Sequence, residues 1–308
     1  MTSEASHDVV VIGGGVAGVT CALECFDIQL DTTLIEANAT LGGQLPEIGH
    51  SVRNVAAGRF ADGRALQGSL LEAADILAGR VRLSHPVSRA DLTERVIEAG
   101  GERIAGRAVV LATGTRRQFL EAAPDGAFDG DVTYQVEPRL DSFAGRDVAV
   151  IGGGDSGSLD ALALARRGSA VTLIHRSPDL TARDDIVRQL RDEPRITDLA
   201  GWDLEATRGT ERLEGVVVVD HSTGQRKDLA VQGLVVKIAR VPNTELFGAQ
   251  LELTGSGAIV VDRELGTSRT GVFAAGDVVA GAYARVAAAL GQGSLAARSV
   301  LSYLEGRS

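Results

Sequence analysis

The glycine-rich turn that begins at Gly13 constrains the fold of this chain more than any other stretch. Four apolar residues at 9–12 predict a short buried strand, and three glycines follow at the spacing G-x-G-x-x-G. Gly13 permits a tight turn, Gly15 lets a pyrophosphate approach the backbone, and Gly18 lets the next helix pack against the strand. That helix, expected over 19–26, presents free N–H groups and a positive dipole end to the phosphates. The pattern therefore predicts a dinucleotide site.

The residues that follow strengthen this prediction. A second apolar strand over 32–35 ends at Glu36, 18 residues after Gly18. An acidic residue is expected about 20 residues beyond the last glycine, where it binds the adenosine ribose. A lone G-x-G-x-x-G would also suit a glycine turn in some other β–α unit. The order of strand, turn, helix, strand and acid favours dinucleotide binding.

The same pattern occurs a second time in the middle of the chain. Residues 147–151 predict a strand, a helix is expected up to Arg167, and a second strand over 170–174 is followed by His175. The turn before the helix repeats the earlier glycine spacing and consists of Gly152, Gly154 and Gly157, with Asp155 and Ser156 between them. Two such folds mean either two bound dinucleotides or a duplicated scaffold that has lost one site.

The order of the remaining segments predicts that the second fold is inserted into the first. A hairpin is expected over 96–104, a closing helix over 282–304, and strands over 81–89, 108–111, 258–261 and 272–277. We therefore expect an α/β protein with two Rossmann-like dinucleotide-binding domains. The first comprises residues 1–116 and 243–308, and the second comprises residues 117–242.

Composition bounds the partners and the location. The chain has 308 residues, enough for about two domains. Its net charge of −10 and its isoelectric point near 5.1 disfavour nucleic acid and anionic membranes as partners. The amino-terminal residues lack the apolar core of a signal peptide, and no apolar run reaches the ~18 residues of a membrane span. We therefore expect a cytoplasmic protein.

The chain has two cysteines, Cys21 and Cys25, which fall one helical turn apart on the first predicted helix. Their Cβ atoms would lie ~5–6 Å apart, whereas a disulfide needs about 3.5–4.5 Å. We therefore expect two buried thiols that pack the helix. The five histidines are scattered and form no ligand set with the cysteines, so no metal site is expected.

Six motifs in this order resemble those of the low-molecular-weight thioredoxin reductase family, over nearly the whole chain. They are GGGVAG at 13–18, GGQL at 42–45, LATG at 111–114, GGGDSG at 152–157, VPNTEL at 241–246 and VFAAGD at 272–277. Each motif alone is weakly informative, but six in the family's order and spacing are specific. The resemblance implies FAD in the first domain, a nicotinamide nucleotide in the inserted domain, and a homodimer.

The resemblance also implies which residues contact FAD. They form the pyrophosphate turn (Gly13, Gly15 and Val16, with Gly18 behind it), the adenosine-ribose site (Glu36), the loop beside the flavin (Gly43, Gln44 and Asn54), the adenine contact (the backbone of Val87), the base of the site (Thr113 and Gly114) and the ribityl contact (Asp277).

One FAD contact departs from the family pattern. The family usually has Arg-Gln-Ala from the seventh residue after the ribityl-binding acid, and this chain has Ala284, Arg285 and Val286 there. A cation at position 285 would favour negative charge at N1–C2=O of the flavin, and hence the reduced anionic flavin. The alternative is that Arg285 points to solvent and the N–H of Val286 alone reaches the flavin.

The nucleotide contacts of the inserted domain depart further. NADP-dependent relatives read His-Arg-Arg after the second strand, with another arginine four residues beyond. This chain keeps His175 and Arg176, and its later arginine is displaced to Arg183. Paired guanidinium groups hold a 2′-phosphate best, yet no acid ends the strand to bind a free ribose, as an NAD site prefers. We therefore predict NADPH over NADH; the alternative is that neither binds well.

The redox dithiol of the family is absent. Counting back from Val148 places the Cys-x-x-Cys positions at Gln135 and Pro138. Without a thiolate there, electrons cannot pass by disulfide exchange, so thioredoxin reduction by the usual route is excluded. We predict an FAD-dependent NAD(P)H oxidoreductase that passes electrons from the flavin directly to a separate acceptor, either a small molecule or a redox protein.

The sequence is compatible with two classes of function. Among enzymes, the alternatives are a ferredoxin– or flavodoxin–NADP reductase, a reductase of small disulfides, and a biosynthetic oxidase or reductase. The other class is a flavoprotein that is independent of pyridine nucleotides or non-catalytic, such as a redox sensor or a partner scaffold. His50 follows the GGQL loop and is the one candidate proton donor near the flavin; the alternative is a surface loop histidine.

Overall fold

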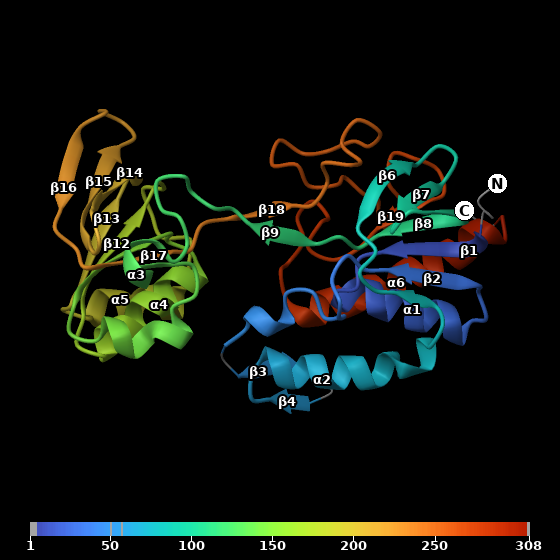
Figure 1. The fold of residues 1–308 in the computed structure, drawn as a ribbon, viewed down its shortest axis with the longest axis horizontal. Coiled ribbons are helices and arrows are strands. Elements are labelled where there is room, and N and C mark those ends of the chain that lie inside the picture. Colours follow the sequence, from blue (N-terminus) through green and yellow to red (C-terminus); the bar gives the residue numbers. More distant parts are fainter. Residues whose placement is uncertain (1–4, 50, 57, 307–308) are drawn as a thin grey trace. The chain divides into compact units, whose positions relative to one another are not determined.

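The computed structural model describes residues 5–49, 51–56 and 58–306 (Figure 1). The chain divides into two compact units: Met1–Arg116 with Val241–Ser308 form the first, and Arg117–Arg240 form the second. The return crossing, at 240–241, lies two residues before the expected boundary at 242–243. Short strands lie at the two crossings, β9 (Thr115–Arg117) and β18 (Arg240–Pro242).

The first unit is built on a seven-stranded sheet. Five strands run parallel in the order β5-β2-β1-β8-β19, and β7 and β6 extend the sheet from β8 as an antiparallel meander. In chain order the strands are β1 (Ala5–Ile12), β2 (Thr32–Ile35), β5 (Val81–Arg82), β6 (Val87–Asp91), β7 (Val96–Ala99), β8 (Glu102–Leu111) and β19 (Val272–Ala274). The apolar residues at the end of β1 are buried because both faces of a parallel sheet are covered.

Helices α1 (Val16–Asp27) and α6 (Val286–Leu304) pack against each other in the first unit. Their backbones approach closely at Gly293, where a β-carbon would lie 2.4 Å from the carbonyl oxygen of Ala17. Helix α2 (Gly63–Ala74) begins after Asp62, whose carboxylate accepts the Ala65 N–H at 2.8 Å. The short elements of this unit are η1 (Leu45–Glu47), β3 (Val52–Val55), β4 (Gly58–Phe60) and η2 (Asp75–Leu77).

The second unit has a parallel sheet in the order β10-β17-β11-β12-β13 and a separate antiparallel sheet of β14, β15 and β16. Its strands are β10 (Val132–Thr133), β11 (Asp147–Ile151), β12 (Ala170–His175), β13 (Ile196–Ala200), β14 (Trp202–Gly209), β15 (Leu213–Asp220), β16 (Arg226–Leu229) and β17 (Gly233–Val236). Its helices are α3 (Ala127–Gly130), η3 (Glu137–Phe143), α4 (Asp155–Arg166) and α5 (Asp184–Asp192). Both glycine turns thus follow a central strand of a parallel sheet.

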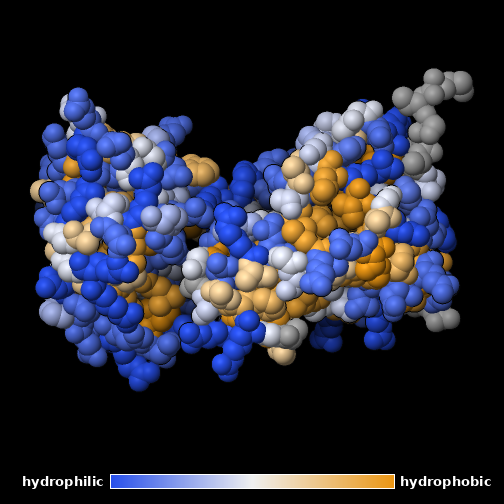
Figure 2. All heavy atoms as spheres, turned by 60° about the horizontal axis from the view of Figure 1, so that its bottom comes forward, coloured by the Kyte–Doolittle hydropathy of each residue, from blue (hydrophilic) through white to orange (hydrophobic). Residues whose placement is uncertain are grey.

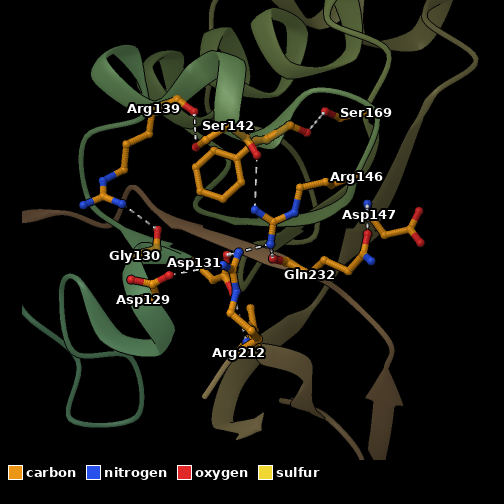
Figure 3. Close-up of polar contacts among 12 residues, drawn as sticks. Asp129, Gly130, Asp131, Arg139, Ser142, Arg146, Asp147, Ser169, Arg212 and Gln232 are labelled. Atoms are coloured by element: carbon orange, nitrogen blue, oxygen red, sulfur yellow. Dashed lines mark hydrogen bonds and ion pairs between the residues drawn. The ribbon is translucent and has the colours of Figure 1, made fainter. Parts of the chain in front are cut away.

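A buried ion-pair cluster joins segments of the second unit (Figure 3). Asp131 precedes β10 and is 1% exposed. Arg146 donates to its Oδ1 at 2.6 Å, Arg212 donates to both carboxylate oxygens at 2.6 and 2.7 Å, and the Leu213 N–H donates at 3.1 Å. Arg146 also donates to the carbonyl oxygen of Gln232. Ligands of parallel sheets bind at the carboxyl ends of the strands, so this cluster at the amino ends serves the fold.

Four expected elements differ from the structure. The strand expected over 81–89 is interrupted between β5 and β6, where Ser84 has a φ of +57°. The second hairpin strand and the strand at 108–111 are one continuous strand, β8. The closing helix begins at Val286 rather than at 282. Residues 258–261 contribute isolated bridges instead of a strand.

No helix in the described ranges combines the length and the apolar composition that crossing a membrane requires.

Candidate functional site

The glycine turn of the first unit leaves open space at the start of α1. A β-carbon on Gly13, whose φ is +107°, would lie 2.3 Å from the carbonyl oxygen of Ala112, and one on Gly18 would lie 1.9 Å from the carbonyl oxygen of Gly13. Both positions therefore require glycine. Gly15 caps the helix, and a β-carbon there would have no atom within 4 Å. A diphosphate can approach this bare backbone at the positive end of the helix.

Glu36 lies beside this turn, at the end of β2. It is 6% exposed. Its Oε2 accepts the Gly14 N–H at 2.7 Å, and its Oε1 accepts the backbone and side-chain N–H groups of Asn38, both at 2.7 Å. Each carboxylate oxygen has about two lone-pair sites, so Oε2 can accept one further hydroxyl. This arrangement suits a ribose held next to the pyrophosphate turn.

A second polar group gathers on the other side of the turn, at the carboxyl ends of β8 and β19. The side-chain amide of Gln44 donates to Asp277 at 3.3 Å and to Thr115 at 3.2 Å. A β-carbon on Gly114, whose φ is +60°, would lie 3.5 Å from the same amide nitrogen. Thr113 is fixed by Asn243, because its hydroxyl donates to the Asn243 carbonyl at 2.8 Å. The order β2-β1-β8-β19 therefore places these residues opposite Glu36 across the glycine turn.

Gly43 joins the two sides, since a β-carbon on it would lie 3.1 Å from Cα of Gly15. The other residues assigned to FAD lie elsewhere in the first unit. Asn54 is exposed on β3, Val87 begins β6 and is half-buried, and Val16 and Val286 begin α1 and α6. His50 lies outside the described residues.

Arg285 is held by its own loop. Its guanidinium carbon lies 4.8 Å from the ring centroid of Tyr283, and Nη1 donates to the carbonyl oxygen of Ala284 at 3.0 Å. The contact of Arg285 with the flavin stays a prediction.

The turn of the second unit repeats this geometry. A β-carbon on Gly152, whose φ is +121°, would lie 2.0 Å from the carbonyl oxygen of Lys237, and one on Gly157 would lie 2.0 Å from the Gly152 carbonyl oxygen. Gly154 caps α4, and a β-carbon there would have Thr181 Oγ1 as its nearest neighbour, at 3.7 Å. The start of α4 is thus also accessible to a diphosphate.

His175 occupies the place that Glu36 has in the first unit. It stands 23 residues after Gly152, the same separation that Glu36 has from Gly13. The imidazole is 5% exposed, and its Nε2 lies 2.8 Å from Oδ1 of Asp198. Its Nδ1 is buried without a hydrogen-bond partner among the described residues. An imidazole at this position leaves the end of β12 without the acid that binds a free ribose diol.

Two arginines flank this strand end. Arg176 is exposed and follows His175 directly. Arg183 is tied to the start of α4: its N–H donates to Asp155 Oδ1 at 2.9 Å, and its Nε lies 3.4 Å from Asp155 and 3.7 Å from Asp185. Ser156 is exposed on the same first turn. Two carboxylates offset the charge of Arg183, so Arg176 is the better placed of the two for an anion.

An open cavity of about 580 Å³ lies next to this strand end, between α5 and the loop before it. Its lining mixes both signs of charge and includes Arg188, Arg191, Asp179, Asp184 and Asp198. Asp198 lines this cavity and also contacts His175. The cavity therefore lies near the ribose-binding position at the end of β12. No group of three or more potential metal ligands gathers in the part of the chain that the structure describes.

Sequence reasoning missed one pair of charged residues at this edge. Lys237 follows β17, and its Nζ lies 3.0 Å from Oδ2 of Asp160 on α4. The signal was readable, because Lys237 interrupts an apolar run at 234–238. Its partner could not be read, because 77 residues separate the two in sequence.

The fold and the two glycine turns define a protein with two dinucleotide-binding domains. The pattern of the pyridine nucleotide-disulphide oxidoreductase family matches residues 7–293, and the chain belongs to this family. Proteins of this family are pyridine nucleotide-dependent oxidoreductases that use FAD and NAD(P)H. The open Gly15 with Glu36 on one side and Asp277 on the other fits FAD. The open Gly154, with Arg176 after the neighbouring strand β12, fits a nicotinamide nucleotide.

Several relatives share most of this chain. The NADH dehydrogenase of Bacillus subtilis is 32% identical over 96% of the chain, which covers 58% of that relative. The NADH dehydrogenase of Ferdinandcohnia aciditolerans is 31% identical, and the chain covers 57% of it. The chain therefore spans less than two thirds of these two proteins. The thioredoxin reductase of Streptomyces clavuligerus is 30% identical over 97% of the chain and 94% of its own length.

Solved structures confirm the expected fold. The thioredoxin reductase of T. acidophilum matches with a TM-score of 0.81 and 26% identity, over 99% of this chain and all of its own. The thioredoxin reductase of Lactococcus lactis matches with a TM-score of 0.84 and 25% identity, over 97% of this chain and 99% of its own. The prediction of an α/β protein with two dinucleotide-binding domains is confirmed.

Proposed function

We propose that this chain passes electrons from NAD(P)H through FAD directly to a separate acceptor, without a dithiol relay. The observation that carries the proposal is the placement of its thiols. The chain has two cysteines, and Gln135 and Pro138 occupy the positions of the family's redox pair. Cys21 and Cys25 lie on α1 of the first unit, and neither is exposed.

Burial keeps both cysteines away from a disulfide partner. The hydrogen bond to Cys25, together with burial, raises the pKa of the Cys21 thiol well above its usual range. Thiolates are the reactive form in disulfide exchange, and reactive cysteines sit in accessible, electropositive surroundings. The hydrogen bond from Cys21 lowers the pKa of the Cys25 thiol. Both side chains are fully buried, however, so neither is accessible to a disulfide, and this supports a packing role.

The residues at the two turns supply binding and orientation. FAD, when bound, supplies the redox chemistry. The Gly15 backbone and the start of α1 would hold its pyrophosphate, Glu36 its adenosine ribose, and Asp277, oriented by Gln44, its ribityl chain. In the second unit, Gly154 and the start of α4 would hold the nucleotide diphosphate.

We propose NADPH as the preferred nucleotide. Arg176 and the absence of an acid at the end of β12 support it, because a guanidinium group recognises a 2′-phosphate. The pairing of Arg183 with two carboxylates predicts that the preference is modest. The relatives named NADH dehydrogenase favour NADH as the second candidate.

Counting electrons tests the proposal. The FAD-loaded protein is titrated anaerobically with NADPH and, separately, with dithionite, while the flavin absorbance is followed. A flavin without a dithiol takes up two electrons per FAD, whereas a flavin with a redox-active dithiol takes up four. A capacity of four electrons would overturn the proposal. Bleaching by dithionite but by neither NADPH nor NADH would favour a flavoprotein that is independent of pyridine nucleotides.

The electron acceptor can be a redox protein or a small molecule. A ferredoxin or flavodoxin–NADP reductase is the second candidate function, because it also transfers electrons from the flavin without a dithiol. Turnover with ferredoxin, flavodoxin, small disulfides, quinones and oxygen would separate these alternatives. His50 stays a weak candidate for proton transfer to such an acceptor.

We also propose a cytoplasmic homodimer that forms through the first unit. On the face drawn in Figure 2, apolar side chains gather over the first unit, while the second unit is mostly hydrophilic. The exposed apolar side chains of the first unit include Leu71 on α2, Ile76 on η2 and Leu295 on α6. Light scattering after gel filtration should give twice the chain mass of 32.0 kDa; the mass of one chain would refute the dimer.

A further inference from the structure

Lys237 and Asp160 form a buried ion pair at the nucleotide edge of the second unit. The Nζ of Lys237 lies 3.0 Å from Oδ2 of Asp160. The two side chains are 13% and 9% exposed. Two charges this far from water are costly, and they are offset only when the geometry is good and further hydrogen bonds satisfy them. The described residues provide Asp160 Oδ2 with no hydrogen bond besides this contact.

The backbone of Lys237 is part of the glycine turn. Its N–H donates to the carbonyl oxygen of Ile151 at 2.7 Å. A β-carbon on Gly152 would collide with the Lys237 carbonyl oxygen, and one on Gly157 would lie 3.4 Å from the Lys237 Cβ. The side chain therefore starts beside the first turn of α4, where a diphosphate would bind, and extends to Asp160 on the next turn.

The strand order places Lys237 opposite the adenosine side. The glycine turn follows β11, which lies between β12 and β17. The ribose-binding position is at the end of β12, where His175 stands. A dinucleotide crosses the carboxyl edge of such a sheet. With the adenosine half at β12, the pyrophosphate lies at the glycine turn and the nicotinamide half extends toward β17 and Lys237.

The pKa of the Asp160 carboxyl group lies near neutral pH. Burial raises its pKa to about 6, the ammonium of Lys237 opposes this shift, and the charge of Glu137 on η3 adds to it. Any loss of Lys237 as a partner would raise the pKa of Asp160 further. The ion pair therefore couples the position of one flexible lysine to the protonation of one carboxyl group.

We propose that Lys237 is a nucleotide-binding residue that exchanges the carboxylate of Asp160 for the pyrophosphate of the nicotinamide nucleotide, and that Asp160 takes up a proton from solvent in the exchange. The proposal rests on the nucleotide site proposed for the second unit. Lysine suits such an exchange because its ammonium group is a point charge on a rotatable four-carbon stem. The pyrophosphate carries more negative charge than the carboxylate that it replaces.

Calorimetry on the FAD-loaded protein tests the proton uptake. NADP⁺ is used because it cannot reduce the flavin, and binding is measured at pH 7 in buffers of different ionisation enthalpy, which gives the number of protons taken up. The 2′-phosphate of NADP⁺ itself titrates near pH 6. The number of protons that Asp160 takes up is therefore the number measured for the wild type minus the number measured for Asp160→Asn. We expect the wild type to take up several tenths of a proton more, and this excess should vanish below about pH 5, where Asp160 is already protonated.

Variants separate a binding role from a structural one. Lys237→Gln should weaken NADP⁺ binding about tenfold, because it removes a charge-assisted contact. Asp160→Asn should bind NADP⁺ at least as tightly as the wild type, because Lys237 no longer has a competing carboxylate. Arg226→Gln is the matched control: it removes one cation from the same unit, in an exposed pair with Glu205 on the separate antiparallel sheet. It should leave both the affinity and the proton count unchanged.

The outcomes distinguish a failure of this inference from a failure of the proposed nucleotide site. Equal proton counts for the wild type and Asp160→Asn, or wild-type affinity in Lys237→Gln, would overturn the inference and leave the nucleotide site standing. A wild type that binds neither NADP⁺ nor NAD⁺ would overturn the nucleotide site itself. If Asp160→Asn fails to fold, the pH series on the wild type and on Lys237→Gln decides, because only the wild type should show the Asp160 contribution.

Discussion

The side-chain amide of Gln44 donates to the carboxylate of Asp277 at 3.3 Å, although 233 residues separate the two in sequence. The same amide donates to the hydroxyl of Thr115 at 3.2 Å. Three segments thus meet at the carboxyl ends of β8 and β19. The contact orients the carboxylate on the side of the glycine turn opposite Glu36, where we propose that it binds the ribityl chain of FAD.

Asp277→Ala should weaken FAD binding at least tenfold, because it removes the hydroxyl acceptor and one of the two acceptors that orient Gln44. Asp277→Asn should weaken it less, because its amide oxygen still accepts from Gln44. The measurement is the FAD retained after gel filtration, followed by titration of the apoprotein with FAD. Thr115→Val removes only the second acceptor of Gln44 and is the control. Unchanged FAD affinity in Asp277→Ala would show that this carboxylate does not contact the cofactor.

Turn chemistry made the glycine positions predictable from the sequence. Gly13 and Gly152 both have positive φ, and both lie where a β-carbon would meet a carbonyl oxygen. Because turn geometry of this kind is set within a few residues, a short sequence pattern is enough to predict where glycine is required. The burial of Cys21 and Cys25 follows from a similar local argument about one apolar helix face, and the structure confirms it.

Contacts between distant segments were not predictable in the same way. The Lys237–Asp160 pair depends on how β17 packs against α4, which no local pattern encodes. The stacking of Arg285 on Tyr283 depends on the path of one loop. The break between β5 and β6 depends on the positive φ of Ser84. Serine rarely adopts this conformation, so the residue type does not predict it.

Gly15→Ala should abolish FAD binding and leave the fold intact. Gly15 has a φ of −74°, which alanine adopts freely, and a β-carbon there meets no protein atom. It would occupy only the space into which a pyrophosphate enters. Gly154→Ala in the second unit, where φ is −86°, should instead impair nucleotide binding and spare FAD. Each variant is the control for the other, with flavin absorbance and NADP⁺ titration as the two measurements. Loss of FAD in Gly154→Ala alone would contradict the assignment of cofactors to the units.

Arg176→Ala should raise the KM for NADPH about tenfold and leave that for NADH nearly unchanged, because only the 2′-phosphate contact is lost. Arg183→Ala should have the smaller effect, because Asp155 and Asp185 already share that guanidinium group. Steady-state reduction of ferricyanide with each nucleotide provides the comparison. Equal changes for NADPH and NADH in Arg176→Ala would mean that this residue does not read the phosphate.

Asp131→Ala should lower the free energy of unfolding by about 3 kcal/mol, because it leaves Arg146 and Arg212 without their buried partner. Burial acts to raise the pKa of Asp131, but hydrogen bonds from Arg212 and Arg146 outweigh it and hold the pKa below its usual value. Because the folded pKa is lowered, the stabilisation is complete above about pH 4 and is lost as the pH falls toward the folded pKa.

Urea unfolding at pH 7 and at pH 3.5 checks both statements about Asp131. The difference between the wild type and Asp131→Ala should shrink at the lower pH. Asp228→Ala breaks an exposed pair with Arg208 in the same unit and should change the stability by less than about 1 kcal/mol. A difference that grows on acidification would mean that the sign of the pKa shift is wrong.

The Cys21→Ser, Cys25→Ser double variant tests the route of the electrons. Both thiols are buried in the packed core of the first unit. If the dithiol positions are Gln135 and Pro138, as the resemblance implies, the flavin is the remaining redox centre. The variant should keep its turnover with quinones or ferricyanide and with its natural acceptor. Some stability should be lost, on the order of 1–3 kcal/mol per site, because serine buries a hydroxyl group in an apolar environment. Stopped-flow measurement separates the two half-reactions. A variant that binds FAD and accepts electrons from the nucleotide, but no longer passes them on, would identify these cysteines as the relay and refute direct transfer from the flavin.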